Sequence, residues 1–271
     1  MKINNEINCY MVRNNNYWRK IFGIELFKVE YYTKWLLYNM LGVKLPKLYD
    51  QHDYWKSRGE VYMDEILSSG YLEREGFFQN LIIGEIKEFD FQSSFEAGCG
   101  FGWNIKRVKE EFPDKRVAGL DFSFTQLKNS ARYMEALNVP VINGDNCLMP
   151  FKNNSFDIGF SLGVFMNIHP KKIKHALSEM ARVCRKYIIH VEWDENNTTD
   201  ELRKKRAFKT NIISHDYRSL YKSLGGDVVK FNTYRDFAGC FKQFQSNVTT
   251  TLERWEGFEG PEKYVLIIVE L

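Results

Sequence analysis

The sequence lacks the cysteine spacing of a disulfide framework or of a metal site. Its five cysteines are an odd number, are widely scattered and include no CxxC pair. They are Cys9, Cys99, Cys147, Cys184 and Cys240. This pattern is typical of reduced thiols in a cytosolic protein. The net formal charge of +3 is also small, so charge gives no argument for a nucleic-acid partner. We therefore expect a cytoplasmic protein without a bound metal.

The sequence also lacks a long uncharged apolar run. Its first six residues lead into no apolar segment of the kind that a signal peptide has. The most apolar stretch, residues 17–43, is interrupted by several charged side chains. A membrane-spanning helix needs about 20 nearly uncharged residues, so we predict no transmembrane helix.

Residues 17–42 contain no proline and are expected to form one long helix that ends near Gly42. Aromatic side chains cover more than one of its faces, and residues 13–47 include seven basic and two acidic residues. Such a helix either caps the main domain or contacts a membrane surface or a partner protein. We predict a helical extension or cap over residues 1–89 and a main domain over residues 90–271. Peripheral contact with the inner membrane face through residues 17–42 is the alternative to a cap.

From residue 93 onward, buried strands alternate with helices. The expected strands are 93–97, 116–120, 139–142, 156–161, 186–192, 227–232 and 264–270. The expected helices are 103–112, 124–137, 171–184 and 214–224, with a further helix at 77–89 before the first strand. This alternation predicts an α/β fold with a doubly wound, seven-stranded, mostly parallel sheet. The last strand follows an irregular stretch, residues 233–263, so we expect it to be antiparallel.

Two helix starts carry capping signals. Ser123 and Gln126 have the spacing of a capping box at the start of helix 124–137. His215 is expected to cap the helix that begins at 214. The aromatic residues of 233–263 either line a substrate pocket or bury an interface, and the pattern does not choose between these roles. They are Tyr234, Phe237, Phe241, Phe244, Trp255 and Phe258.

The strand 93–97 ends in a turn with glycines at positions 98, 100 and 102. A dinucleotide-binding loop requires GxGxxG, but position 103 is Trp103. The turn lacks the Lys-Ser/Thr pair of a triphosphate loop and any other basic residue. Asp121 follows the next strand and is spaced to bind ribose hydroxyls. Asp145 follows the third strand and can accept from an adenine amine. Together these residues indicate a ligand that contains adenosine.

At this point the sequence resembles the class I S-adenosylmethionine-dependent methyltransferases. Five segments match in family order and spacing, over about residues 90–195. They are Phe95–Gly102, Gly119–Ser123, Asn143–Phe151, Asn154–Ser161 and Gly163–Ile168. The resemblance implies a Rossmann-like methyltransferase fold and S-adenosyl-L-methionine as cofactor.

The resemblance also implies roles for individual residues. Glu96, Gly98 and Gly100 would hold the methionyl end of the cofactor. Asp121 would hold the ribose, and Asp145 with Asn146 the adenine. Phe122 and Ser161 belong to the same expected cofactor site. Arg58 with Tyr62 is the counterpart of an N-terminal segment that closes over the cofactor carboxylate. For each of these residues, a purely structural role as a turn former, a helix cap or a surface or core side chain is the alternative.

A hydroxyl acceptor needs a general base within reach. The candidates are His169, His190 and Glu192, with Asp194 continuing the face of the last two if the strand stays extended. Glu192 and Asp194 could instead help to bind a divalent cation, and a solvated strand end is the structural alternative for all of them.

The likeness of residues 185–193 and 206–209 to enzymes of bacterial surface-polysaccharide pathways suggests methylation of a sugar hydroxyl. Another small-molecule or saccharide acceptor, an RNA acceptor, and a scaffold or regulatory partner without turnover are the alternatives. No recognisable nucleic-acid-binding module supports the RNA reading.

Overall fold

The computed structural model describes residues 20–22, 24–42, 55–56, 58–68, 70–200, 203, 212–246 and 264–271. The chain divides into two compact units, and each is described by itself. The first unit contains residues 1–50 and 200–212, and the second contains residues 51–199 and 213–271. The boundary that we expect between residues 89 and 90 stays a prediction.

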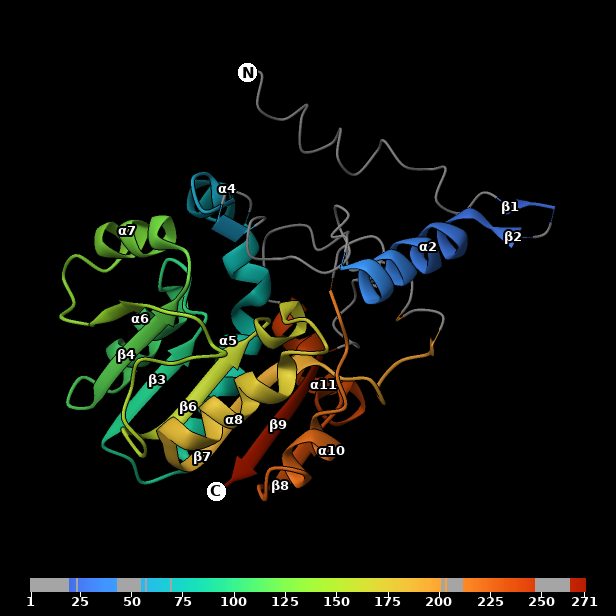
Figure 1. Ribbon diagram of the computed structural model, residues 1–271. Helices are drawn as coiled ribbons and strands as arrows, with labels where there is room; N and C mark the ends of the chain where they lie inside the picture. The colour runs from blue at the N-terminus through green and yellow to red at the C-terminus, as the bar shows by residue number, and fades with distance from the viewer. Residues whose placement is uncertain are drawn as a thin grey trace. The chain divides into compact units, whose positions relative to one another are not determined.

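In residues 20–42, the described part of the first unit's amino-terminal segment, a short hairpin is followed by a helix (Figure 1). Strand β1, Lys20–Ile21, pairs antiparallel with β2, Ile24–Glu25, and α2 spans Leu26–Leu41. The prediction of one helix over 17–42 is therefore wrong at its start, because Phe22 has a φ of 49° and turns the chain back. The predicted end is confirmed: Gly42 takes a φ of 64°, as the residue after a helix often does. Within the described residues, no helix is long and apolar enough to cross a membrane.

The second unit is built on a seven-stranded sheet in the order β5-β4-β3-β6-β7-β9-β8 (Figure 1). The strands are β3 Ser93–Ala97, β4 Arg116–Asp121, β5 Val141–Asn143, β6 Phe156–Leu162, β7 Cys184–Trp193, β8 Asp227–Asn232 and β9 Tyr264–Glu270. Strands β3 to β7 are parallel, and β9 runs antiparallel to both β7 and β8. The expected fold class, with its antiparallel last strand, is confirmed. The order reverses at β3 and β6, where this architecture places its ligands.

The helices of the second unit flank this sheet. They are α4 Tyr62–Ser68, α5 Tyr71–Lys87, α6 Trp103–Glu111, α7 Phe124–Tyr133, α8 Ile173–Val183, α10 Tyr217–Lys222 and α11 Tyr234–Ser246, with a 3₁₀ turn η1 at Phe165–Asn167. Helices α8 and α10 pack together, and α5 contacts α6 and α11. The fully buried side chains of α8 and α10 form one core with those of β3, β7 and β9.

Helix α11 is a correction, because residues 233–263 were expected to be irregular. Asp236 accepts hydrogen bonds from the amide and hydroxyl of Thr233, which is a capping interaction that starts the helix. Phe237 and Phe241 of α11 pack against Phe77 of α5 at ring-centre distances of 5.7 and 5.0 Å. These aromatic residues therefore bury an internal interface. Trp255 and Phe258 lie outside the described residues.

Three further local predictions differ from the structure. Ser123 occupies the N-cap position of α7, but its side chain makes no capping hydrogen bond. Helix α10 begins at Tyr217 and is capped by Asp216, which accepts from the Ser219 amide, so the predicted cap at His215 is wrong. Helix α5 begins six residues before the predicted start, after Gly70 with a φ of 69°.

Asp157 links the amino ends of β3 and β6, the two central strands. Its buried carboxylate accepts from the amides of Gln92 and Ser93 at 2.7 and 3.0 Å and from Arg185 at 2.6 Å. Burial alone would raise the pKa of Asp157, but these donors and the charge of Arg185 hold the pKa well below its usual range. A group with a lowered pKa stabilises the fold above its ordinary pKa, and this contribution is lost as the pH falls.

We predict that Asp157→Ala lowers the free energy of unfolding by about 1–3 kcal/mol, because it leaves the buried Ser93 amide without an acceptor. Urea unfolding near neutral pH measures this loss. The difference from the wild type should shrink in acid. Asp114→Ala, at an exposed position of the α6–β4 turn, is the control and should change stability little. Equal stability of Asp157→Ala and the wild type at neutral pH would contradict the assignment.

Candidate active site

The glycine turn after β3 is tied directly to the end of β4. Gly98, Gly100 and Gly102 have φ values of 73°, 53° and 92°, which side chains rarely adopt. The Gly98 amide donates to the Leu120 carbonyl at 2.7 Å. A Cβ atom at Gly98 would lie 2.4 Å from a methyl group of Val164, so the turn also packs against the segment after β6. The turn therefore has a single conformation that only glycine fits at these points.

Glu96, the penultimate residue of β3, has one satisfied and one unsatisfied carboxylate oxygen. Its Oε1 accepts from Asn104 Nδ2 at 2.7 Å. Its Oε2 is buried and accepts no hydrogen bond within the described part of the chain. Burial raises the pKa of Glu96 to about 8, although the Asn104 side chain and the Ile105 amide oppose this shift. A buried acceptor without a partner is costly, which indicates that a ligand supplies the missing donor.

Asp121, the last residue of β4, links the glycine turn after β3 to the turn after β4. Its Oδ2 accepts from the Gly100 amide at 2.9 Å, and its Oδ1 accepts from the Ser123 amide at 2.7 Å. Burial raises its pKa, and these two amides oppose the shift. A carboxylate has about four acceptor positions, so each oxygen retains capacity for a ligand hydroxyl. Asn143 donates to the carbonyls of Asp121 and Phe122 and holds this loop in place.

Further unsatisfied oxygens lie at the same edge. Ser123 Oγ, Gln126 Oε1 and Asn146 Oδ1 are buried and have no hydrogen-bond partner among the described residues. Gln126 faces the turn, since a Cβ atom at Gly100 would lie 3.9 Å from its amide nitrogen. Sequence reasoning assigned Gln126, together with Ser123, to a capping box and so missed that Gln126 faces the glycine turn. The edge is therefore lined with buried acceptors, as a ligand rich in donors requires.

Asp145 and Asn146 follow β5 at the neighbouring position of the sheet edge. Asp145 is exposed, and its Oδ1 accepts from the Cys147 amide at 2.8 Å. The Gly144 amide donates to the Asp121 carbonyl at 3.1 Å, which brings this loop beside Asp121. The sequence-predicted cofactor residues after β3, β4 and β5 thus lie along one edge.

The predicted closing segment packs against the same turn. Arg58 forms an ion pair with Glu65 at 2.6 Å and lies 5.6 Å from the ring centre of Tyr62. The Tyr62 ring is 6.0 Å from that of Phe101, which lies within the glycine turn. The role of Arg58 in closing over a cofactor carboxylate stays a prediction. In that role the Arg58 guanidinium would either break its ion pair with Glu65 or contact Glu65 and the cofactor carboxylate together.

Ser161, whose predicted contact with the cofactor stays a prediction, lies in a buried hydrogen-bonded chain. Its hydroxyl donates to Glu192 at 2.7 Å and lies 2.7 Å from His190 Nδ1. His190 Nε2 is 2.5 Å from the Tyr221 hydroxyl. Burial lowers the pKa of His190 to about 3, so the ring is neutral. With Ser161 donating to Glu192, His190 donates through Nδ1 and accepts from Tyr221 through Nε2.

Glu192 organises the turn that follows β6. Its Oε1 accepts from the amides of Val164 and Phe165 at 2.9 and 3.0 Å, and its Oε2 accepts from the Met166 amide at 3.1 Å. Burial raises its pKa, and Ser161 with these amides opposes the shift. Because Val164 packs on Gly98, Glu192 acts on the glycine turn through this segment.

The three predicted bases are all engaged by the protein itself. His190 and Glu192 are fully buried, and His169 is 8% exposed. His169 Nδ1 accepts from the Lys171 amide at 3.0 Å, so the acceptor nitrogen of the neutral ring is occupied. Asp194, considered with Glu192 as a cation ligand, accepts from the amides of Asn196 and Tyr217. Within the described residues, no group of acidic, histidine or cysteine side chains has the arrangement of a metal site.

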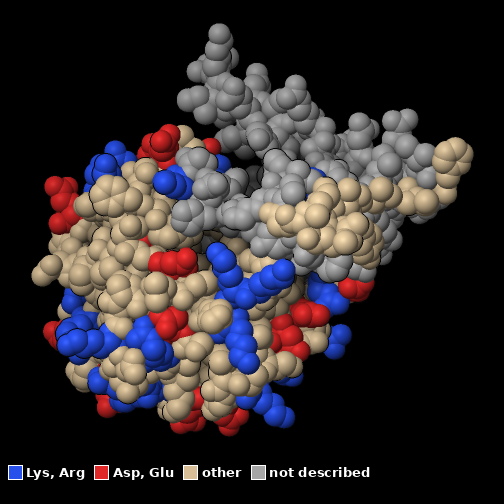
Figure 2. All heavy atoms as spheres, in the orientation of Figure 1, with Lys and Arg blue, Asp and Glu red and all other residues tan. Residues whose placement is uncertain are grey.

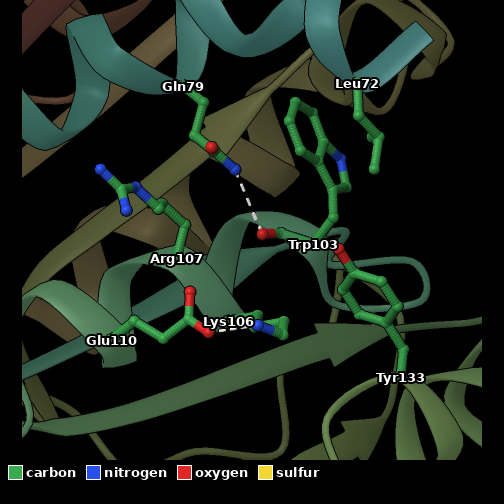
Figure 3. A pocket seen from close by; sticks show the side chains of 7 residues that line it. All are labelled: Leu72, Gln79, Trp103, Lys106, Arg107, Glu110 and Tyr133. Carbon is green, nitrogen blue, oxygen red and sulfur yellow. Dashed lines mark hydrogen bonds and ion pairs between the residues drawn. The ribbon is translucent and has the colours of Figure 1, made fainter. Parts of the chain in front are cut away.

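Figure 3 shows a pocket on the outer side of α6, bordered by α5 and by the end of α7. It is lined by Leu72, Gln79, Trp103, Lys106, Arg107, Glu110 and Tyr133. Gln79 Nε2 donates to the Trp103 carbonyl at 3.1 Å and to Asn104 Oδ1 at 3.2 Å. Asn104 in turn donates to Glu96. Gln79 of this pocket therefore holds the Glu96 side chain in position through Asn104. Sequence reasoning missed Gln79 and Asn104 because neither belongs to a motif.

The comparisons with known proteins agree with this geometry. Residues 95–187 match a family model described as a methyltransferase domain. Demethylmenaquinone methyltransferase of Staphylococcus aureus is 39% identical over 99 residues, which cover 34% of this chain. The matched part spans only 38% of the length of that relative.

Solved structures support the fold. A geranyl diphosphate C-methyltransferase from Streptomyces coelicolor, solved with S-adenosyl-L-homocysteine, has a TM-score of 0.53 and 16% identity, covering 66% of this chain and 73% of that one. An S-adenosylmethionine-dependent methyltransferase from Mesorhizobium loti has a TM-score of 0.52 and 13% identity, covering 66% and 90%. The match over residues 95–187 and the shared fold bear out the predicted resemblance to the class I methyltransferases.

We predict that Glu96→Gln makes the ligand-free protein less sensitive to pH. The raised pKa of Glu96 means that the unfolded chain releases its proton between pH 4.5 and about 8 while the folded chain retains it. Wild-type stability should therefore fall with rising pH across this interval by up to about 1.4 kcal/mol per pH unit from this group alone. Glutamine keeps an acceptor for Asn104 and removes this slope.

Urea unfolding of both proteins at several pH values across that interval measures the difference. The other buried acids are common to both proteins, so the difference isolates Glu96. Parallel stability curves would show that the carboxyl group of Glu96 is not held protonated by burial.

Proposed function

We propose that this chain is an S-adenosylmethionine-dependent methyltransferase with a small-molecule acceptor. The observation that carries the proposal is the unsatisfied Oε2 of buried Glu96 beside the glycine turn, with Asp121 bonded to the same turn. The α-amino group of the cofactor is a donor of the kind that Glu96 lacks. The ribose hydroxyls are donors of the kind that Asp121 has capacity to accept.

Each loop of the edge would hold one part of the cofactor. Glu96 would bind the amino group of the methionyl end, and the backbone of Gly98 and Gly100 would permit its close approach. Asp121 would accept from the ribose, and Asp145 with Asn146 would receive the adenine. Ser123 and Gln126, through their buried unsatisfied oxygens, are additional candidates for this surface.

The bound cofactor supplies an electrophilic methyl group that an acceptor displaces in line. The contribution of the chain is to orient the two reactants and to exclude water. The contacts of Glu192 and His190 favour a positioning role for both over the predicted base role. Glu192 would fix Val164 against the glycine turn, and His190 would fix Ser161 and thereby Glu192. His169 as a base stays a prediction.

Two acceptor classes remain in the proposal. The sequence favours a sugar hydroxyl, in a polysaccharide pathway. The names of the similar proteins suggest an acceptor with a prenyl chain. They include a demethylmenaquinone methyltransferase and a geranyl diphosphate C-methyltransferase. The observation that favours the second class is the exposed apolar face of α2, which is described below. A scaffold without turnover fits less well, because it has no need of a buried unpaired carboxylate at Glu96.

Titration calorimetry with S-adenosylmethionine and S-adenosylhomocysteine tests the proposal at the level of the cofactor. We expect saturable binding of both compounds. Methyl-labelled cofactor with panels of saccharide and prenylated acceptors then tests turnover. Absence of cofactor binding by a folded protein would overturn the proposal, and binding without turnover on any acceptor would support the scaffold.

We predict that Asp121→Ala weakens S-adenosylmethionine binding about tenfold or more, because it removes charged acceptors for two hydroxyl groups. Calorimetry measures the affinity, and circular dichroism checks that the fold remains. Asp157→Ala, at the opposite end of the sheet, is the control and should bind the cofactor with unchanged affinity. Unchanged affinity in Asp121→Ala would refute the ribose assignment.

A further inference from the structure

The exposed side of α2 carries an apolar stripe. Val29, Tyr32, Leu36 and Met40 are 51%, 49%, 49% and 70% exposed. Their spacing of three, four and four residues places them on one face of the helix. Exposed helix faces are ordinarily polar or charged, whereas this face adds only Thr33, which is also exposed and uncharged.

The charged positions of α2 fall outside this stripe. Lys28, Glu30 and Lys34 are the charged residues of the helix, and at about 100° per residue none lies between Tyr32 and Met40 around the axis. Among the side chains of residues 20–42 that the structure describes, drawn in Figure 2, only Lys34 is charged. The stripe is therefore a continuous apolar strip with charge only at its sides.

Exposed apolar side chains continue beyond both ends of the stripe. Phe22, at the turn of the hairpin before α2, is 99% exposed, and Ile24 is 57% exposed. Leu41, the last residue of α2, is 68% exposed. Removing such apolar side chains from water favours binding, so the set is suited to contact with an apolar surface.

The charge of the segment distinguishes between the surfaces that this stripe fits. Residues 13–47 carry seven basic and two acidic residues. A second copy of the chain would bring two such basic segments together, and their repulsion opposes pairing. An anionic lipid surface attracts each basic residue and accepts the apolar side chains at the headgroup boundary. Since α2 is not long and apolar enough to span a bilayer, it would lie along the surface.

We propose that α2, with the β1–β2 hairpin, docks this chain on the surface of an anionic lipid bilayer. The stripe of Val29, Tyr32, Leu36 and Met40 enters the headgroup boundary, and the basic residues of the segment contact anionic headgroups. The docking goes beyond methyl transfer, and it would bring the protein to an acceptor that is dissolved in, or attached to, a membrane.

Co-sedimentation of the full chain with vesicles tests the proposal. One set of vesicles contains phosphatidylcholine alone, and the other contains about 30% phosphatidylglycerol, which supplies the anionic surface. We expect saturable binding to the anionic vesicles, weaker binding to the neutral ones, and loss of binding as salt screens the headgroups. No binding of the folded wild type to anionic vesicles would overturn the proposal, whether or not the protein binds S-adenosylmethionine.

A double variant assigns the binding to the stripe. Leu36→Glu with Met40→Glu should weaken vesicle binding about tenfold or more, because two apolar contacts are lost and two negative charges are added. Val229→Glu is the matched control: Val229 is 49% exposed on β8 in the other unit, and its variant should bind vesicles as the wild type does. Equal loss in both variants, or no loss in the double variant, would overturn the assignment.

Size-exclusion chromatography with light scattering tests whether a second copy of the chain covers the stripe instead of lipid. We expect the wild type and the double variant to have the same mass in the absence of lipid. An oligomer that the double variant converts to a monomer would show that a second copy covers the stripe and would contradict lipid docking.

Discussion

The hydrogen bond of 2.9 Å from the Gly100 amide to Asp121 is the contact on which the candidate active site depends. This bond links the turn after β3 to the end of β4. A second bond, from Gly98 to the Leu120 carbonyl, fixes the turn from its other side. The left-handed backbone of the glycines is therefore imposed by the edge of the sheet. Removal of the Asp121 carboxylate would change the shape of the site as well as its charge.

Two buried glutamates, Glu192 and Glu96, differ in how many hydrogen bonds the chain supplies to them. Glu192 receives one hydroxyl and three backbone amides, so both its oxygens are satisfied by the chain. Glu96 receives donors at one oxygen only, and its other oxygen is buried without a partner. Burial raises the pKa of both groups. The number of hydrogen bonds that each carboxyl group receives, more than its pKa, separates Glu192, which is satisfied by the chain, from Glu96, which we propose to bind the cofactor.

The sheet, and the position of the glycine turn and of the aspartates along one of its edges, could be predicted from the sequence because both depend on local signals. Parallel strands such as β4 are buried on both faces, and residues 117–120 of β4 form a continuous apolar run. The glycine spacing and the aspartates after β4 and β5 lie at fixed places relative to those strands. Helix α11 was missed because its aromatic side chains were read as an irregular stretch, although Thr233 and Asp236 carried a capping signal.

The roles of the polar residues beyond the edge could not be predicted in the same way. Strand alternation correctly places His190 and Glu192 on one face, but it does not reveal that this face is covered by Tyr221 and by the segment after β6. The spacing of Ser123 and Gln126 is that of a capping box, yet Ser123 makes no capping bond, its hydroxyl lies beside Gly59, and the Gln126 amide faces Gly100 of the glycine turn. Burial and partners are properties of the folded chain, and these decide whether a polar residue binds, positions or caps.

The most direct test of the central claim is a crystal structure of the protein with S-adenosylhomocysteine. We predict that the amino group of the ligand lies within hydrogen-bond distance of Glu96 Oε2 and that its ribose hydroxyls contact Asp121. A ligand bound elsewhere, or bound at the glycine turn with Glu96 Oε2 still lacking a donor, would contradict it.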